Sequence, residues 1–292
     1  MRRREFITLL GSATATWPLA TRAQQPLIAV VGLLSSAQLD DRRIGAIRQG
    51  LKDGGYIEGR NLAIKYRSAD SHFDQLPTMA ADLVSDPVGA IVALGPQATV
   101  AAKAATTTTP IVFAMGADPV DLGLVSNLNR PGGNLTGITF LTNILGAKRL
   151  ELLHELIPRV TVIGFLINPG NPTSESQIRD VQAAARVFDI ETLILHAGSE
   201  RNIEAAFASF AQQRVNAVIV GADSLFLSRR DQLAGLAARH AIPAIYPLRE
   251  FADIGGLRAM HPARRMPIIS PVVTPRGFSK AKSRLTCRFN RR

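Results

Sequence analysis

The stretch "GAIVALGPQATVAAKAATTTTPIVFAMG", residues 89–116, decides the fold class. It holds an apolar run that ends at Gly95, an alanine-rich stretch that begins at Pro96, and a second apolar run after Pro110. Both runs are apolar throughout rather than alternating, which is typical of parallel strands covered on both faces. The stretch therefore predicts a strand, a helix that stops at Pro110, and a second strand parallel to the first.

The same alternation of strands and helices continues on either side of this stretch. The further elements are expected at 27–34 (strand), 41–54 (helix), 61–68 (strand), 73–86 (helix) and 135–141 (strand). Together with residues 89–116, they predict one α/β lobe, lobe 1, over residues 26–140.

The alternation of strands and helices then begins again and predicts a second lobe, lobe 2, over residues 141–257. Its helices are expected at 142–157, 171–189, 199–213 and 224–240, and its strands at 160–168, 190–196, 215–221 and 242–247. Two such units without a low-complexity linker predict an α/β protein of two Rossmann-like lobes with parallel sheets. Ligands bind such sheets at the carboxyl ends of the strands, so we expect a cleft between the lobes.

The net charge of +11 is confined to the two ends of the chain. Residues 24–257 hold 20 Lys and Arg against 22 Asp and Glu, whereas residues 258–292 hold ten Lys and Arg and no acidic residue. Residues 24–257 are nearly neutral and so lack the excess of positive charge that is typical of a nucleic-acid-binding protein. No nucleic-acid partner is therefore expected. The single cysteine excludes a disulfide framework and a cysteine-based metal site.

Residues 1–23 have the pattern of an export signal. The basic segment 2–4 precedes an apolar stretch from Phe6 to Ala20, and small residues near Ala23 fit a cleavage site before Gln24. The apolar stretch is too short to span a bilayer. "RRREFI" is similar to a twin-arginine export motif, and the alternative is an ordinary Sec signal. We expect the mature protein in the periplasm.

Small polar residues follow most of the predicted strands, at 35–36, 95–99, 115–119, 168–171, 221–224 and 246–247. Carboxyl ends of parallel strands meet at one edge of a sheet, so these loops are expected to face the cleft. Short polar groups and free helix N–H groups are suited to an amide, carboxylate or amine on a small ligand. For each loop taken alone, helix capping and turn formation are the alternative.

Motifs for catalysis are missing from the sequence. It contains no G-x-S-x-G, P-loop, H-E-x-x-H or G-x-G-x-x-G pattern. The five histidines form no metal-ligand pair at helical spacing. We therefore expect no enzymatic activity, no cofactor and no metal.

Five segments carry a resemblance to a known family. They are "GYIEGRNLAIKYRSAD" (55–70), "AADLVSDPVGAIVALG" (80–95), residues 101–142, "GAKRLELLHELIP" (146–158) and "LINPGNP" (166–172). Together they resemble the ABC transporter substrate-binding proteins related to tryptophan- and tyrosine-type binding proteins. The resemblance implies the type I periplasmic binding protein fold, in which two lobes close over a ligand by a hinge motion and then dock on a membrane permease.

The resemblance also implies ligand contacts from both lobes. An aspartate is expected to pair with a ligand ammonium, and the helix N-termini after Ser36 and Gly95 to hold a carboxylate. The implied contacts are Ser35, Ser36, Gln97, Thr99, Gly116 and Asp118 in lobe 1, and Asn168, Asn171, Asp223 and Tyr246 in lobe 2.

The chain departs from the family pattern after Leu257. Members continue with a helix and a "RILKG-x-KPADLPV" stretch, whereas residues 258–292 here are basic and proline-rich. Permissible codons for residues 276–291, read from the third base, give Arg-Ile-Leu-Lys-Gly-Lys-Lys-Pro-Ala-Asp-Leu-Pro-Val-Gln-Gln. Our hypothesis is a frameshift near residues 257–261, with an out-of-frame, poorly ordered tail after it; the alternative is a genuine basic tail.

The sequence thus predicts a monomeric, periplasmic solute receptor of an ABC importer. Its ligand is expected to be a small molecule, such as an amino acid or a related aromatic or carboxylate compound. One alternative is an enzyme on a flavodoxin-like or Rossmann-like scaffold, which requires a catalytic pair that the sequence lacks. A sugar-sensing regulator requires an N-terminal helix-turn-helix, and the export signal occupies that place.

Overall fold

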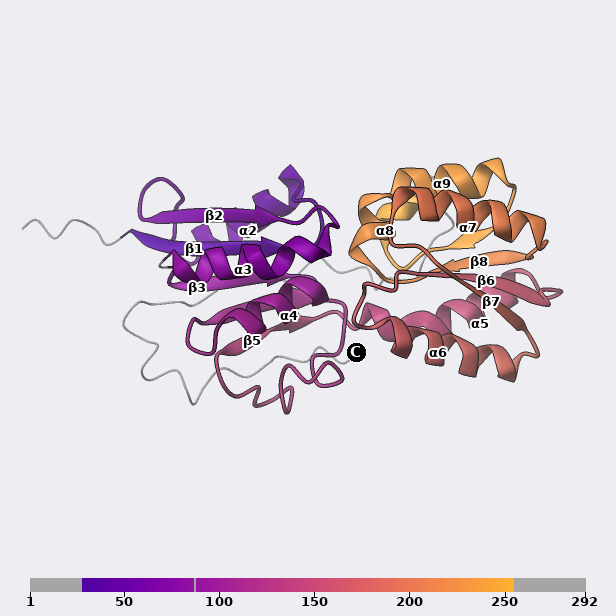
Figure 1. Ribbon diagram of the computed structural model, residues 1–292, viewed down its shortest axis with the longest axis horizontal. Helices are drawn as coiled ribbons and strands as arrows, with labels where there is room; N and C mark the ends of the chain where they lie inside the picture. Colours follow the sequence, from indigo (N-terminus) through magenta and orange to yellow (C-terminus); the bar gives the residue numbers. More distant parts are fainter. Residues whose placement is uncertain (1–27, 87, 255–292) are drawn as a thin grey trace, which may run out of the picture.

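The computed structural model describes residues 28–86 and 88–254, which fold into two α/β lobes lying side by side (Figure 1). Each lobe is built around its own parallel sheet, and this confirms the predicted fold class. The predicted export signal and the basic tail lie outside the described residues.

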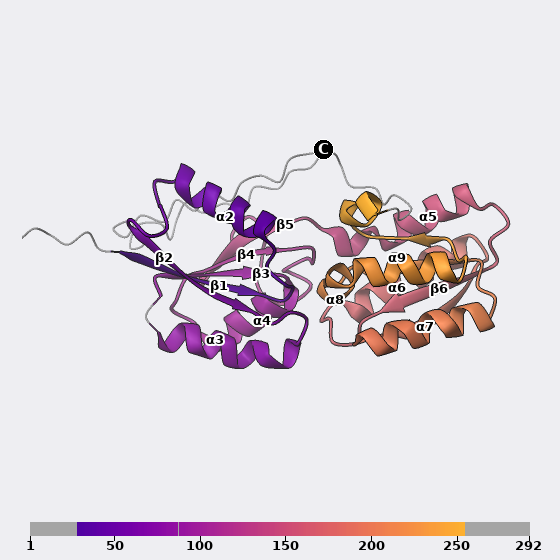
Figure 2. The ribbon, with the colours of Figure 1, turned by 90° about the horizontal axis from the view of Figure 1, so that it is seen from above.

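Lobe 1 has a five-stranded sheet of order β2-β1-β3-β4-β5, parallel throughout. Its strands are β1 (Ala29–Ser35), β2 (Leu62–Ser68), β3 (Ala90–Leu94), β4 (Ile111–Met115) and β5 (Leu135–Thr139). Its helices are α2 (Asp41–Asp53), the 3-10 turn η1 (Phe73–Gln75), α3 (Leu76–Ser85) and α4 (Pro96–Ala105). Figure 2 shows α2 on one side of this sheet and α3 on the other.

The two faces of the lobe 1 sheet are buried to different extents. Residues such as Ile91 and Phe113 pack with α3 and α4 in one fully buried cluster. Their neighbours Val112, Ala114 and Ile138 have the opposite orientation, because side chains alternate along a strand, and they remain partly exposed. Within the described residues, the α3–α4 side therefore holds the main core of lobe 1.

Lobe 2 has a four-stranded parallel sheet of order β7-β6-β8-β9. Its strands are β6 (Val162–Ile167), β7 (Glu191–His196), β8 (Ala217–Val220) and β9 (Ala244–Ile245). Its helical segments are η2 (Thr142–Leu145), α5 (Gly146–Leu156), α6 (Ser174–Val187), α7 (Glu200–Gln212), α8 (Ser224–Ser228), α9 (Arg230–Arg239) and η3 (Arg249–Ile254).

Alternation along the central strands of lobe 2 creates two cores. Leu166 and Val218 pack with Phe210 and other side chains of α7 and α9. Phe165 and Ile219, one residue away on the same strands, pack with α5 and α6. Both faces are therefore covered, as the continuous apolar runs predict.

Helix α4 ends earlier than the sequence pattern predicts. It stops at Ala105 rather than continuing to Pro110. The Oγ1 atom of Thr106 accepts hydrogen bonds from the N–H groups of Thr108 and Thr109. A threonine side chain that bonds the following backbone favours a turn over a helix, so the threonine run forms a turn before β4.

Several other predicted elements are shorter or interrupted. The helices expected at 73–86 and 142–157 each begin as a 3-10 turn, and the helix expected at 224–240 is broken at Arg229 into α8 and α9. The strand expected at 242–247 is only two residues long.

Between the described parts of the two lobes, the chain crosses through residues 140–145. Leu141 adopts a left-handed conformation with φ 51°, which is uncommon for a residue other than glycine. Asn143 ties the crossing to both lobes, because its N–H donates to Gly116 O and its Nδ2 donates to Thr173 Oγ1. Within the described residues, no helix combines the length and apolarity needed to cross a bilayer.

Candidate ligand-binding site

The structure brings the carboxyl ends of β3, β6 and β8 together between the lobes. Gly95 ends β3 with φ 97°, a conformation open mainly to glycine, and the turn places Gln97 in the first turn of α4. Asn168 and Asn171 follow β6, and Asp223 follows β8. These four predicted residues meet in one group, which we call the amide–carboxylate cluster.

Asp223 is the centre of the amide–carboxylate cluster. Its Oδ1 accepts hydrogen bonds from Asn168 Nδ2 at 2.9 Å and from Leu225 N at 2.8 Å. Its Oδ2 accepts from Asn171 Nδ2 at 2.8 Å and from Gln97 Nε2 at 3.2 Å. Gln97 belongs to lobe 1 and the other residues to lobe 2, so the cluster joins the two lobes.

Within the described chain, the cluster has one unsatisfied acceptor and a carboxylate without a counter-charge. Burial raises the pKa of Asp223, although its hydrogen bonds from Asn168, Leu225, Asn171 and Gln97 act in the opposite direction. All four donors are neutral, so no charge within these contacts balances the carboxylate. Gln97 Oε1 is buried and accepts no hydrogen bond from the described residues. This arrangement favours a cationic hydrogen-bond donor such as an ammonium group.

A cavity of about 520 Å³ adjoins the cluster and lies between the lobes. Gln97 and Asn171 line it together with apolar side chains from α3 and α4 and with the loop that follows β6. Its volume is within the range of small-molecule pockets, and an apolar wall beside a few polar groups is their usual composition.

A second hollow of about 320 Å³ also lies between the lobes, and most of its charged lining residues are acidic. Asp118 and Asp121 line it from lobe 1, and Glu175, Arg179 and Asp180 from lobe 2. Asp118 itself accepts a hydrogen bond from Val120 N at 2.8 Å, as in a turn. Among the described residues, no group of three His, Cys, Asp or Glu side chains is arranged to hold a metal ion.

Three predicted residues of lobe 1 use their hydroxyl groups within that lobe. Ser36 Oγ accepts from Ala98 N at 2.9 Å and so joins the end of β1 to the start of α4. Thr99 Oγ1 donates to the backbone oxygen of Gly95 at 2.8 Å. Ser35 Oγ donates to the backbone oxygen of Ala37 at 2.7 Å. These contacts shape the cleft wall and do not extend into the cluster.

Gly116 and Tyr246 also lie apart from the cluster. A Cβ atom on Gly116 would meet Thr142 Oγ1 at 2.1 Å, so only glycine lets the interlobe crossing pack here. Tyr246 is 1% exposed, stacks on Phe251 with ring centroids 4.5 Å apart, and donates to Leu233 O at 3.4 Å. Its side chain belongs to the core of lobe 2, although a residue directly after a strand was expected to face the cleft.

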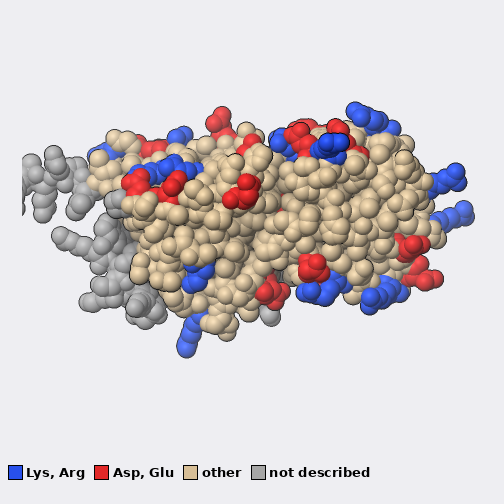
Figure 3. Space-filling model, in the orientation of Figure 1, with Lys and Arg blue, Asp and Glu red and all other residues tan. Residues whose placement is uncertain are grey.

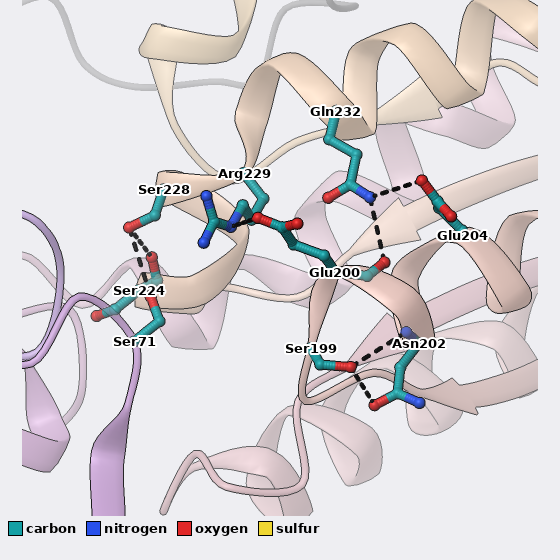
Figure 4. Close-up of polar contacts among 9 residues, drawn as sticks. All are labelled: Ser71, Ser199, Glu200, Asn202, Glu204, Ser224, Ser228, Arg229 and Gln232. Carbon is teal, nitrogen blue, oxygen red and sulfur yellow. Dashed lines mark hydrogen bonds and ion pairs between the residues drawn. The ribbon is translucent and has the colours of Figure 1, made fainter. Parts of the chain in front are cut away.

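The structure adds residues that the sequence pattern did not single out. The ring of Phe73 lines the cavity and packs against the cores of both lobes. Two residues before it, Ser71 points across the interface toward α8 (Figure 4), where its Oγ lies 3.5 Å from Ser228 Oγ. A phenylalanine at the start of a predicted helix gives no signal of such a position, which depends on how the lobes meet.

Charges on the described surface are mixed in sign. Figure 3 shows Lys and Arg interspersed with Asp and Glu over both lobes on the face in view. Several exposed pairs are in contact, such as Arg48 with Glu58 at 2.6 Å. This face therefore has no single-sign patch of the kind that attracts a polyanion.

The sequence matches the ABC transporter substrate-binding protein family over residues 27–262. The chain belongs to this family. The basic tail after residue 262 lies outside the match. A curated relative, a tyrosine-binding protein of Clostridioides difficile (strain R20291), is 28% identical over 222 residues. The aligned part covers 76% of this chain and 63% of that relative, so the chain spans less than two thirds of the relative's length.

Solved structures support the fold of this substrate-binding protein. A conserved domain protein from Vibrio cholerae O1 biovar El Tor is similar with a TM-score of 0.70 and 26% identity, covering 78% of this chain and 77% of that one. An ABC domain from Streptococcus pneumoniae, solved with L-Trp, gives a TM-score of 0.68 at 23% identity with the same coverage. At this identity the second likeness concerns the fold alone.

Proposed function

We propose that this chain is the solute receptor of an ABC importer and that it binds a small amine-bearing molecule, an amino acid or related aromatic compound, between its lobes. The role is one of binding and delivery rather than catalysis. Export to the periplasm and docking on a permease are parts of the same proposal, supported by the export-like pattern of residues 1–23 and by family membership.

The observation that carries this proposal is the contact between Gln97 and Asp223. It joins the lobes at 3.2 Å beside a cavity, and it involves a carboxylate that only neutral donors contact. A ligand ammonium placed there would contact both lobes at once and would stabilise their closed arrangement. The tyrosine-binding relative supports a ligand with an ammonium group and an aromatic ring.

Calorimetric titration and thermal unfolding of the full chain with L-tyrosine and L-tryptophan test this proposal. At least one of them should bind and raise the unfolding midpoint, because a ligand that binds only the folded state stabilises it. Asp223→Ala should abolish the effect, since the ammonium loses its counter-charge. Asp53→Ala, which removes an exposed carboxylate at the end of α2, is the matched control and should respond like the wild type. Equal responses of the two variants would contradict the assigned site.

A further inference from the structure

The cavity beside the amide–carboxylate cluster has an unbalanced set of polar groups. Its wall from lobe 1 consists mainly of apolar side chains of α3 and α4, among them Leu76, Val100, Ala101 and Ala104. No Lys, Arg or His is among its lining residues in the described chain. A ligand carboxylate in this cavity would therefore depend on N–H groups rather than on a cation.

The lobe 2 wall supplies no N–H group for such a carboxylate. This wall is the loop after β6, in which Pro169 and Pro172 have no N–H. The N–H of Gly170 donates to Asn168 Oδ1 at 3.0 Å, and that of Asn171 donates to Asn168 O at 3.1 Å. The side-chain amide of Asn171 is used as well, because it donates to Ala222 O and to the carboxylate of the cluster.

Within the described part of the chain, the lobe 1 wall of the cavity supplies only one free N–H group for a ligand carboxylate. Pro96 has no N–H, and the next amides of α4 are used by Ala98, which donates to Ser36 Oγ, and by Thr99, which donates to Gly95 O. The N–H of Gln97 is the one first-turn amide for which the described residues contain no acceptor. Protein carboxylate sites commonly use two or three N–H donors, so this wall is poorly suited to an anion.

One hydrogen-bond acceptor beside the cavity, in contrast, has no donor within the described part of the chain. A carboxylate only accepts hydrogen bonds, so the amide nitrogen of Gln97 must face Asp223, and its Oε1 remains for a ligand. Gln97 is only 7% exposed and lines the cavity; its Oε1 atom is itself buried and has no partner among the described residues, so a ligand reaches it only with a movement of the Gln97 side chain. A buried acceptor without a donor is costly, and a ligand N–H would remove that cost.

From this imbalance we infer that the site takes an apolar primary amine without an α-carboxylate, such as an arylalkylamine. The ammonium donates to Gln97 Oε1 beside the Asp223 carboxylate, and the apolar group occupies the cavity between α3, α4 and the loop after β6. This inference rests on the proposed function and narrows its ligand class from amino acids to the corresponding amines.

A matched ligand series tests the inference on the full chain by calorimetric titration. Tyramine, L-tyrosine and 3-(4-hydroxyphenyl)propionate share one ring and differ in their charged groups. Tyramine should bind about tenfold more tightly than L-tyrosine, because the carboxylate of the amino acid must be desolvated with too few donors. The propionate, which has no ammonium, should give no measurable binding.

The outcomes separate the inference from the proposed function. L-tyrosine binding as tightly as tyramine, or more tightly, would overturn the inference and leave an amino-acid receptor in place. Binding of the propionate alone would overturn the inference and the amine-bearing ligand class together. Absence of binding by all three, and by tryptamine and L-tryptophan, would overturn both.

Variants of Gln97 test the proposed hydrogen bond. Gln97→Leu and Gln97→Met should weaken tyramine binding by about tenfold or more, since both remove the acceptor while keeping the volume similar. Gln49→Leu, at an exposed glutamine of α2, is the matched control and should bind like the wild type. Undiminished tyramine binding by a folded Gln97→Met variant would overturn the assigned role.

Discussion

Asp223 should make the free energy of unfolding depend on pH, in addition to its role in ligand binding. Burial raises its pKa above the ordinary value of 3.8, so the folded state keeps the proton to a higher pH than the unfolded state does. Between these two pKa values the folded state binds more protons, and the free energy of unfolding contributed by Asp223 therefore falls as the pH rises. Below 3.8 and above the raised value, this contribution is constant.

Urea denaturation of the wild type and of Asp223→Asn across acidic to neutral pH measures this contribution. The difference between the two free energies of unfolding should change in that window, with the wild type losing stability relative to the variant as the pH rises. Parallel curves for the wild type and Asp223→Asn would contradict a raised pKa at this carboxyl.

At the scale of elements, capping and apolar periodicity are predictable, whereas contacts between elements are not. Ser199 was expected to open the helix at 199–213, and its Oγ accepts from Asn202 N at the start of α7. The break between α8 and α9 follows no local signal; the residue there, Arg229, pairs with Glu200 of α7 at 2.8 Å. Local chemistry fixes where elements begin, and tertiary contacts decide where they are interrupted.

The same distinction applies to the candidate site. Four residues of the amide–carboxylate cluster could be predicted, because polar residues at the ends of parallel strands converge at one edge. Tyr246 follows a strand too, yet the chain turns inward after β9 and buries its ring against Phe251. Phe73 could not be predicted, since its position depends on the packing of one lobe against the other.

Arg149 connects helix α5 to the end of strand β8, which pairs with the short strand β9. Val218 N donates to Pro243 O at 2.8 Å, and this parallel register, if continued two residues beyond the end of β9, would set Val220 O opposite the nitrogen of residue 247. Residue 247 is a proline and has no N–H. Arg149, on α5, donates to Val220 O instead. Burial, without a carboxylate contact among the described residues, lowers the pKa of Arg149 to about 10.

A double-mutant cycle tests whether the Arg149 side chain takes the place of the backbone N–H that residue 247 lacks. Arg149→Met should lower the free energy of unfolding by about 1–3 kcal/mol, because it leaves a buried carbonyl without a donor. Pro247→Ala restores a backbone N–H, so it should recover part of the loss in the Arg149→Met background and give no gain alone. Lys148→Met, one residue away and exposed, should change stability little. Additive effects of Arg149→Met and Pro247→Ala would show that the two groups do not share Val220 O.

On the scale of the whole molecule, the described residues of the two lobes make few polar contacts with one another. The hydrogen bond from Gln97 to Asp223 spans 3.2 Å, and the hydroxyls of Ser71 and Ser228 lie 3.5 Å apart (Figure 4). A hydrogen bond of this kind contributes a net free energy of only about 0.5–1.5 kcal/mol. A ligand that adds contacts to both lobes should therefore shift the population toward the closed form.

The pair Ser71 and Ser228 provides a direct measurement of closure. Ser71→Cys with Ser228→Cys, in a Cys287→Ser background, should form a disulfide under mild oxidation, because the separation of the two hydroxyls permits a bond of about 2.05 Å after a small shift. Saturating tyramine or L-tyrosine, whichever binds, should accelerate the loss of free thiols by raising the closed fraction. Single-cysteine variants should show no such acceleration. A rate of thiol loss that the bound ligand leaves unchanged or slows would mean that ligand binding does not close the lobes over the amide–carboxylate cluster.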